Sequence, residues 1–164
     1  MQNLFTLAVA LSAILFKNAV VLAANPHFNY CNATGVSATG TVTVSFKEAG
    51  LGANQNIAYQ ATATATATYV CVNKGGNLPQ DPKKTSVTGP VSTTGIFNSG
   101  KNGNIVASLT ISPPPAPSTF TCPPGQTMRL ASVSYTNVAV TDTTNNVTCQ
   151  TSPATFSRTF ITLK

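Results

Sequence analysis

The chain has no tryptophan, one histidine and only three acidic residues, so it offers few candidate catalytic side chains. Acid–base catalysis needs titratable side chains within reach of a substrate. Here the three carboxylates are expected in separate turns, at Glu48, Asp81 and Asp142. Glycoside hydrolysis would need two of them to converge. We therefore expect no enzyme and no catalytic residue, and a hydrolase is the least favoured alternative.

Motifs for metals, cofactors and nucleic acids are missing as well. The four cysteines lack the C-x-x-C spacing of a zinc site, and His27 is the only histidine. One carboxylate per loop makes a poor calcium site. Lys83 and Lys84 are the only adjacent basic pair, whereas nucleic-acid binders concentrate Lys and Arg in runs or on one face. We expect no metal, no cofactor and no nucleic-acid partner.

An apolar run from Leu4 to Phe16 opens the chain and is followed by the small residues Ala23 and Ala24. This pattern is typical of a secretory signal peptide over residues 1–24. The alternative is a signal-anchor helix, because residues 4–24 are nearly long enough to span a bilayer. Cleavage is favoured because the apolar core before Lys17 is short. We expect a secreted, extracellular protein with no membrane segment after cleavage.

Cleavage after Ala24 leaves 164 − 24 = 140 residues, enough for one domain with its own core. Loss of Lys17 leaves eight basic and three acidic side chains, a sparse net charge of 8 − 3 = +5. Ser and Thr supply 37 of the 140 residues. Because Thr is β-branched and suits a pleated surface with one wet face, this composition favours β-sheet.

Four cysteines in a secreted chain imply two disulfides, with three possible pairings. We choose Cys71–Cys122, since both cysteines continue an inward-facing alternation and Cys71 is expected between the sheets. Cys31 and Cys149 lie in polar, turn-rich sequence and suit a peripheral staple. Two sequons adjoin this second pair, and in a eukaryotic host they predict N-glycosylation at Asn32 and Asn146.

Alternation with a period of two predicts strands. In the longest, 57–72, alanines alternate with threonines, so Ala61, Ala63, Ala65 and Ala67 are expected in the core and Thr62, Thr64, Thr66 and Thr68 outside. Further strands are expected at 41–46, 85–97, 104–112, 127–141 and 155–163. The second of these is expected as one or two short strands, interrupted at Gly89 and Pro90.

Two features indicate how the strands are connected. Val133 and Tyr135 occupy odd positions but Val138 and Val140 even ones, which predicts a β-bulge near Thr136 and Asn137. Residues 98–103 are typical of a hairpin connection. Residues 113–117 are Pro-rich and are expected to cross stiffly from one sheet to the other, the alternative being an SH3-like ligand.

About seven strands with regular turn signals predict an all-β fold, an antiparallel, immunoglobulin-like β-sandwich. A closed β-barrel is the alternative. After the signal peptide we expect an N-terminal segment, 25–39, and the sandwich domain, 40–164.

Four segments, 44–52, 67–73, 97–103 and 122–126, resemble a group of small secreted proteins from soil bacteria and fungi. No activity is established for that group, so the resemblance implies secretion and transfers no catalytic residue. The pair Cys31 and Cys149 and the two sequons look like additions to the pattern of the group.

The leading hypothesis is a secreted, non-enzymatic interaction protein, in its concrete form a fungal effector-like protein at a host or competitor surface. Its partner would be a host protein or a cell-wall polysaccharide. Loops on a rigid sandwich are common binding elements, and the basic loop residues form the candidate interaction surface: Lys74, Lys83, Lys84 and Lys101. The alternative is a carbohydrate-binding or cell-wall-associated module, although the exposed aromatic residues that sugars usually stack on are few.

Overall fold

The computed structural model describes residues 25–163, so the expected signal peptide and its alternative lie outside the described residues. Within this range the chain forms strands and no helix: β1 (His27–Ala33), β2 (Val42–Ala49), β3 (Asn56–Asn73), β4 (Lys84–Asn98), β5 (Ile105–Ile111), β6 (Gln126–Asp142), β7 (Val147–Gln150) and β8 (Phe156–Thr159). No helix between residues 25 and 163 is long and apolar enough to cross a membrane.

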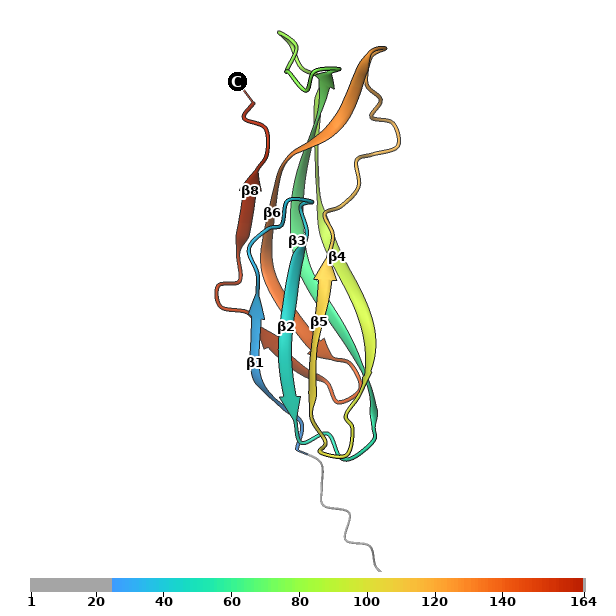
Figure 1. The fold of residues 1–164 in the computed structure, drawn as a ribbon, viewed down its shortest axis with the longest axis vertical. Coiled ribbons are helices and arrows are strands. Elements are labelled where there is room, and N and C mark those ends of the chain that lie inside the picture. Colours follow the sequence, from blue (N-terminus) through green and yellow to red (C-terminus); the bar gives the residue numbers. More distant parts are fainter. Residues whose placement is uncertain (1–24, 164) are drawn as a thin grey trace, which may run out of the picture.

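Two antiparallel sheets pack face to face (Figure 1). The smaller has the order β1-β2-β5, and the larger has the order β4-β3-β6-β7, with β8 also paired to β6. The antiparallel sandwich is thereby confirmed. The barrel alternative is wrong, because the outer strands of one sheet do not pair with those of the other. The immunoglobulin-like topology stays a prediction.

Two of the eight strands were not expected: β1 carries no clear alternation, and β7 alternates over only four residues. Both lie at a sheet edge, and in β1 Cys31 is the one buried residue. β1 pairs with β2 in the smaller sheet, so the expected N-terminal segment contains one of its strands.

The core lies between the inner faces, where the alternation of the sequence decides burial. Ala61, Ala65 and Ala67 are 0% exposed and Ala63 is 6% exposed, whereas the four intervening threonines are partly or fully exposed. The predicted orientation of β3 is confirmed. Small alanines on β3 leave room for the larger inward side chains that pack against them, among them Phe46 and Tyr135.

The predicted bulge is present in β6. Thr62 pairs with Ala139 and Thr64 with Thr136, so two residues of β6 oppose Ala63. One of the two, Asn137, has a φ of 56°, a left-handed conformation that Asn tolerates better than most residues. The extra residue returns the valines of β6 to the inner face, as the change of parity requires.

The strand predicted with an interruption at Gly89 and Pro90 is continuous, and β4 spans both residues. β4 is an edge strand, where a proline without an N–H breaks no ladder on the open side. The segment 98–103 does not close a hairpin, because β4 and β5 belong to different sheets. The Pro-rich segment runs from β5 to β6 and crosses between the sheets as predicted. The last strand is shorter than expected and ends at Thr159.

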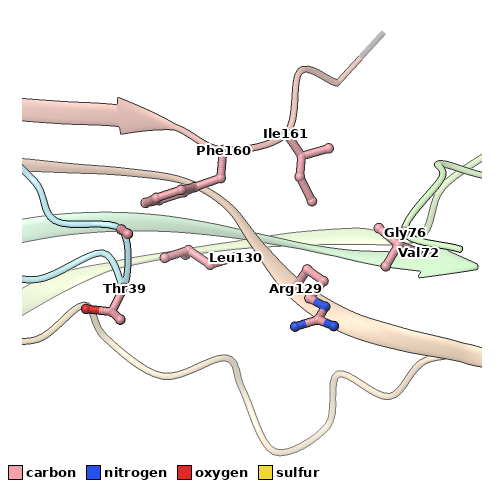
Figure 2. Close-up of a pocket in the computed structure, with 8 residues that line it drawn as sticks. Thr39, Val72, Gly76, Arg129, Leu130, Phe160 and Ile161 are labelled. Carbon is pink, nitrogen blue, oxygen red and sulfur yellow. The ribbon is translucent and has the colours of Figure 1, made fainter. Parts of the chain in front are cut away.

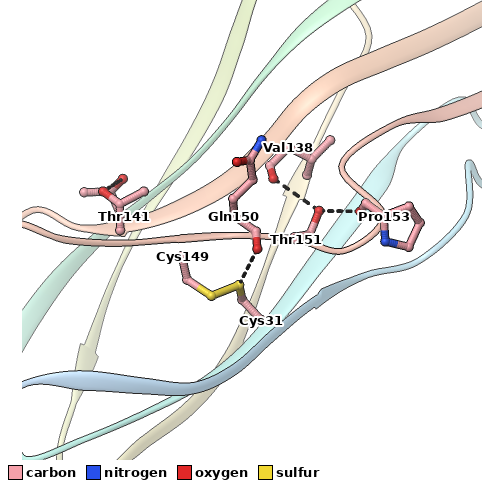
Figure 3. The surroundings of a disulfide bond; sticks show 8 residues. Cys31, Val138, Thr141, Cys149, Gln150, Thr151 and Pro153 are labelled. Atoms are coloured by element: carbon pink, nitrogen blue, oxygen red, sulfur yellow. Dashed lines mark hydrogen bonds between the residues drawn. A yellow bond between two sulfur atoms is a disulfide. The ribbon is translucent and has the colours of Figure 1, made fainter.

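The disulfides pair Cys31 with Cys149 and Cys71 with Cys122, with Cα–Cα distances of 6.2 and 5.5 Å. The predicted pairing is confirmed, and Cys71 is 0% exposed as expected, but the bridge that joins the two sheets is the other one. Cys31–Cys149 connects β1 to β7 and so joins the two sheets (Figure 3). Cys71–Cys122 connects β3 to the connection between β5 and β6. β3 has 18 residues and β2 has 8, so the end of β3 that carries Cys71 extends beyond the smaller sheet.

Next to the inter-sheet bridge, Thr151 fixes the chain between β7 and β8. Its side chain is 3% exposed, and its Oγ1 donates toward the carbonyl oxygens of Val138 at 3.2 Å and Pro153 at 2.7 Å (Figure 3). The bridge and this buried hydroxyl together anchor the edge of the larger sheet.

Candidate functional site

The four lysines of the expected interaction surface do not lie together. Lys74 and Lys83 belong to the loop between β3 and β4, and Lys84 begins β4 at the same end of the sandwich. Lys101 lies in the connection between β4 and β5 at the opposite end (Figure 1). A single surface can therefore use the first three and not Lys101.

One of these lysines is held in place by the Pro-rich connection. The Nζ of Lys83 donates to the carbonyl oxygen of Thr121 at 2.7 Å and lies 5.5 Å from the centroid of the Phe120 ring. A cation over an aromatic face is attracted by the ring quadrupole. Lys83 therefore joins the β3–β4 loop to the segment that carries Cys122.

A groove lies at the same end of the molecule as these three lysines. It measures about 390 Å³ and is lined by Ala38, Thr39, Val72, Gly76, Arg129, Leu130, Phe160 and Ile161 (Figure 2). Its apolar walls come from β3, β6 and the C-terminal segment after β8. Val72 belongs to a small second core with Val70 and Ala131, against which Ile161 and Leu163 pack.

The groove has one charged lining residue, Arg129, which is exposed at its rim (Figure 2). The sequence has three acidic side chains in all, and two of them, Glu48 and Asp142, are buried elsewhere. From Tyr59, beside that pair, to Val72 in the groove, β3 runs 13 residues, roughly 40 Å at the usual rise per residue. Asp81 is therefore the one acidic side chain that can lie near Arg129 and the lysines at this end of the sandwich.

The second notable cluster is a buried carboxyl pair. Glu48 on β2 and Asp142 at the end of β6 are both 0% exposed and lie within hydrogen-bonding reach of each other. Tyr59 on β3 donates its O–H to Oε2 of Glu48 at 2.7 Å. Asp142 accepts bonds from the backbone N–H groups of Thr144 and Asn145 at 2.8 and 2.9 Å.

The pKa of Glu48 is raised to about 7: burial is the main cause, the Tyr59 hydrogen bond opposes the shift, and the neighbouring Asp142 adds to it. Burial also raises the pKa of Tyr59. Oε1 of Glu48 has no other hydrogen-bond partner in the described chain. Because its pKa is raised, the Glu48 carboxyl keeps its proton over a wider pH range than an exposed glutamate does.

The expectation that the carboxylates lie in separate turns is wrong for two of the three. Glu48 lies within β2 and faces inward, in register with Val42, Val44 and Phe46. Asp142 likewise continues the inward series of Val138 and Val140. The even parity of both residues was the signal in the sequence that could have placed them in the core. Asp81 stays in the exposed β3–β4 loop.

The two sequon asparagines are both exposed. Asn32 lies on the edge strand β1, and Asn146 lies in the turn between β6 and β7. Between residues 25 and 163 no group of three or more His, Cys, Asp and Glu side chains gathers into a metal site.

Comparison with known proteins adds no relative: no family model matches the sequence, and no curated protein matches it.

Proposed function

We propose that this is a secreted, non-enzymatic interaction protein whose binding site is the groove bordered by Arg129. The observation that carries the proposal is an apolar groove of about 390 Å³ with an exposed guanidinium at its rim and no acidic lining residue. Lys74 and Lys84 are exposed at the same end and add positive charge around it. The two disulfides and the expected signal peptide support secretion.

The lining chemistry selects an amphipathic anion. Leu130, Phe160 and Ile161 are partly exposed and offer apolar contact, and burying an apolar ligand against them is favourable in proportion to the area removed from water. The Arg129 guanidinium presents a planar set of donors that matches a carboxylate or sulfonate. A ligand with an apolar body and one terminal acid group satisfies both parts of the groove.

The non-enzymatic part of the proposal rests on the burial of the only carboxyl pair. Glu48 and Asp142 are 0% exposed, so neither touches a surface that a substrate could reach. Asp81, the third acidic residue, is solitary in its loop. In this reading the protein acts by binding, with an effector-like role at a host or competitor surface as its concrete form. Comparison of transcript levels in free-living and host-associated growth tests that role, and flat expression would count against it.

Anilinonaphthalene sulfonate, an apolar fluorophore with one anionic group, is a suitable first probe of the folded protein. We expect its fluorescence to rise on binding and decanoate to displace it competitively. Arg129→Met should weaken binding about 10- to 150-fold, since a hydrogen bond to a charged group contributes about 1.5–3 kcal/mol. Arg129→Lys should keep part of the affinity, and Ala38→Phe should fill the groove and prevent binding.

The matched control is Lys101→Met, which removes one exposed positive charge at the opposite end of the sandwich. It should leave the affinity for both probes unchanged. Equal losses in Arg129→Met and Lys101→Met would show that only net charge matters and would refute the proposed site. Absence of any binding to the wild-type protein would refute it as well.

A further inference from the structure

The outer face of the larger sheet carries two rows of hydroxyl groups that cross four strands. Residues paired in register point to the same side of a sheet, so the pairings define the rows. The first row consists of Ser86, Thr68, Ser132 and Thr159, and the second of Thr88, Thr66, Ser134 and Ser157. All eight side chains are partly or fully exposed.

Hydrogen bonds between neighbouring strands orient part of this array. Thr66 Oγ1 lies 2.9 Å from Thr88 Oγ1, and Thr68 Oγ1 lies 2.9 Å from Ser86 Oγ. One hydroxyl of each pair donates to the other, and each pair keeps one O–H and several lone pairs for another molecule. Because these rotamers are already fixed, a ligand that binds them loses little side-chain freedom on the protein.

The array is hollowed where β3, β6 and β8 meet. A depression of about 230 Å³ lies there, and six of its eight lining residues are hydroxyl residues of the two rows: Thr66, Thr68, Ser132, Ser134, Ser157 and Thr159. The other two are Val133 and Arg158. The hydroxyls stand roughly 4.8 Å apart across the strands and roughly 6.6 Å apart along them, the usual repeats of a sheet.

We propose that this hydroxyl depression binds a neutral polysaccharide chain. The ligand must present both donors and acceptors, because every hydroxyl of the array is both. An apolar ligand would strip water from these hydroxyls without replacing their hydrogen bonds, which costs free energy. The lining has no acidic residue and a single cation, Arg158, which is already bonded to the Val36 carbonyl at 3.0 Å, so charge does not dominate it.

A repeating sugar chain also fits the shape of the surface. Sheets twist from strand to strand, so the two rows curve and suit a single flexible chain better than a flat lattice. The site is separate from the groove at Arg129, since the two depressions share no lining residue. Binding here therefore neither requires nor follows from the proposed function.

The test is calorimetric titration of the mature protein with the soluble hexasaccharides of chitin, cellulose and β-1,3-glucan. We expect at least one to bind. The double variant Thr66→Val, Ser134→Ala removes two central hydroxyls with little change of volume and should lower that affinity about 10-fold or more, as expected for two lost hydrogen bonds.

The matched control is Thr43→Val on the outer face of the smaller sheet. Thr43 forms the same kind of pair there, with its Oγ1 2.9 Å from Thr110 Oγ1, and this change should leave sugar binding intact. Failure of all three hexasaccharides to bind, or an equal loss in Thr43→Val, overturns the proposal. A loss in Arg129→Met equal to that of the double variant would place the sugar in the groove and overturn it too. Inhibition of ice growth without sugar binding would assign the array to ordered water instead.

Discussion

Replacing Glu48 by glutamine should remove most of the pH dependence of stability between pH 4.5 and 8. Glu48 is 0% exposed, accepts a hydrogen bond from Tyr59 at 2.7 Å, and has a pKa raised to about 7 by burial and by Asp142. Glutamine has nearly the same shape. Its carbonyl can accept from Tyr59 and its amide can donate to Asp142, so the contacts survive without a titrating proton.

The direction follows from proton binding in the two states. Between pH 4.5 and about 7 the unfolded chain releases the Glu48 proton while the folded protein keeps it. Because the folded state binds more protons in this window, stability falls as pH rises. A difference of about 2.5 pKa units at 1.36 kcal/mol each predicts a loss of about 3 kcal/mol by pH 8. Below pH 4.5 the Glu48 contribution is fully present.

Urea denaturation at several pH values measures this directly. With an m-value of about 1–3 kcal/mol/M, a loss of 3 kcal/mol lowers the midpoint by about 1–3 M between pH 4.5 and 8. The Glu48→Gln midpoint should change much less over the same range. Tyr59→Phe removes the hydrogen bond that opposes the shift, so the decline of that variant should extend to higher pH.

Two results would refute this reasoning. One is a wild-type midpoint that rises between pH 5 and 8, since a raised pKa of a buried acid can only lower stability there. The other is an equal decline in the wild type and in Glu48→Gln, which would assign the pH dependence to other groups. Far-ultraviolet circular dichroism before denaturation checks that both proteins have the same strand content.

Three further predictions concern the packing, the bridges and the sequons. Ala65→Phe should overpack the space between the sheets and cost about 1–3 kcal/mol in thermal or urea unfolding, whereas Thr64→Val on the exposed face should be nearly neutral. Loss of the 118-residue loop closed by Cys31–Cys149 should cost about 5 kcal/mol, and loss of the 51-residue loop closed by Cys71–Cys122 about 4 kcal/mol, measured on Cys→Ala pairs; a reversed order would contradict the chain-entropy account. In a eukaryotic host, glycosidase treatment should lower the apparent mass of the wild-type protein on a gel by two glycans. It should lower that of each single Asn→Gln variant, at Asn32 or Asn146, by one glycan.

The strands and their orientation could be read from the sequence because each depends on local alternation. The Ala-Thr repeat of β3 fixed which side chains enter the core, and the change of parity between Tyr135 and Val138 located the bulge. The inward alternation that ends at Cys71 and Cys122 also pointed to their pairing. A period of two was sufficient to predict these features, because each depends only on which face of a strand is buried. An edge strand such as β1 buries few of its side chains, so its sequence shows no alternation of apolar and polar residues.

The candidate sites depend on which strands become neighbours, and a period of two does not determine this. Parity alone could have turned Glu48 and Asp142 inward, but only the packing of β2 against β6 brings their carboxyls together. The hydroxyl rows need β4, β3, β6 and β8 to align in one register, and residues 86 and 159 of a row are far apart in the chain. The groove at Arg129 exists because the C-terminal segment leaves the sheet after Thr159 and packs beside Val72. These contacts are long-range and are set by the total burial of the two sheets, so the tertiary structure decided them.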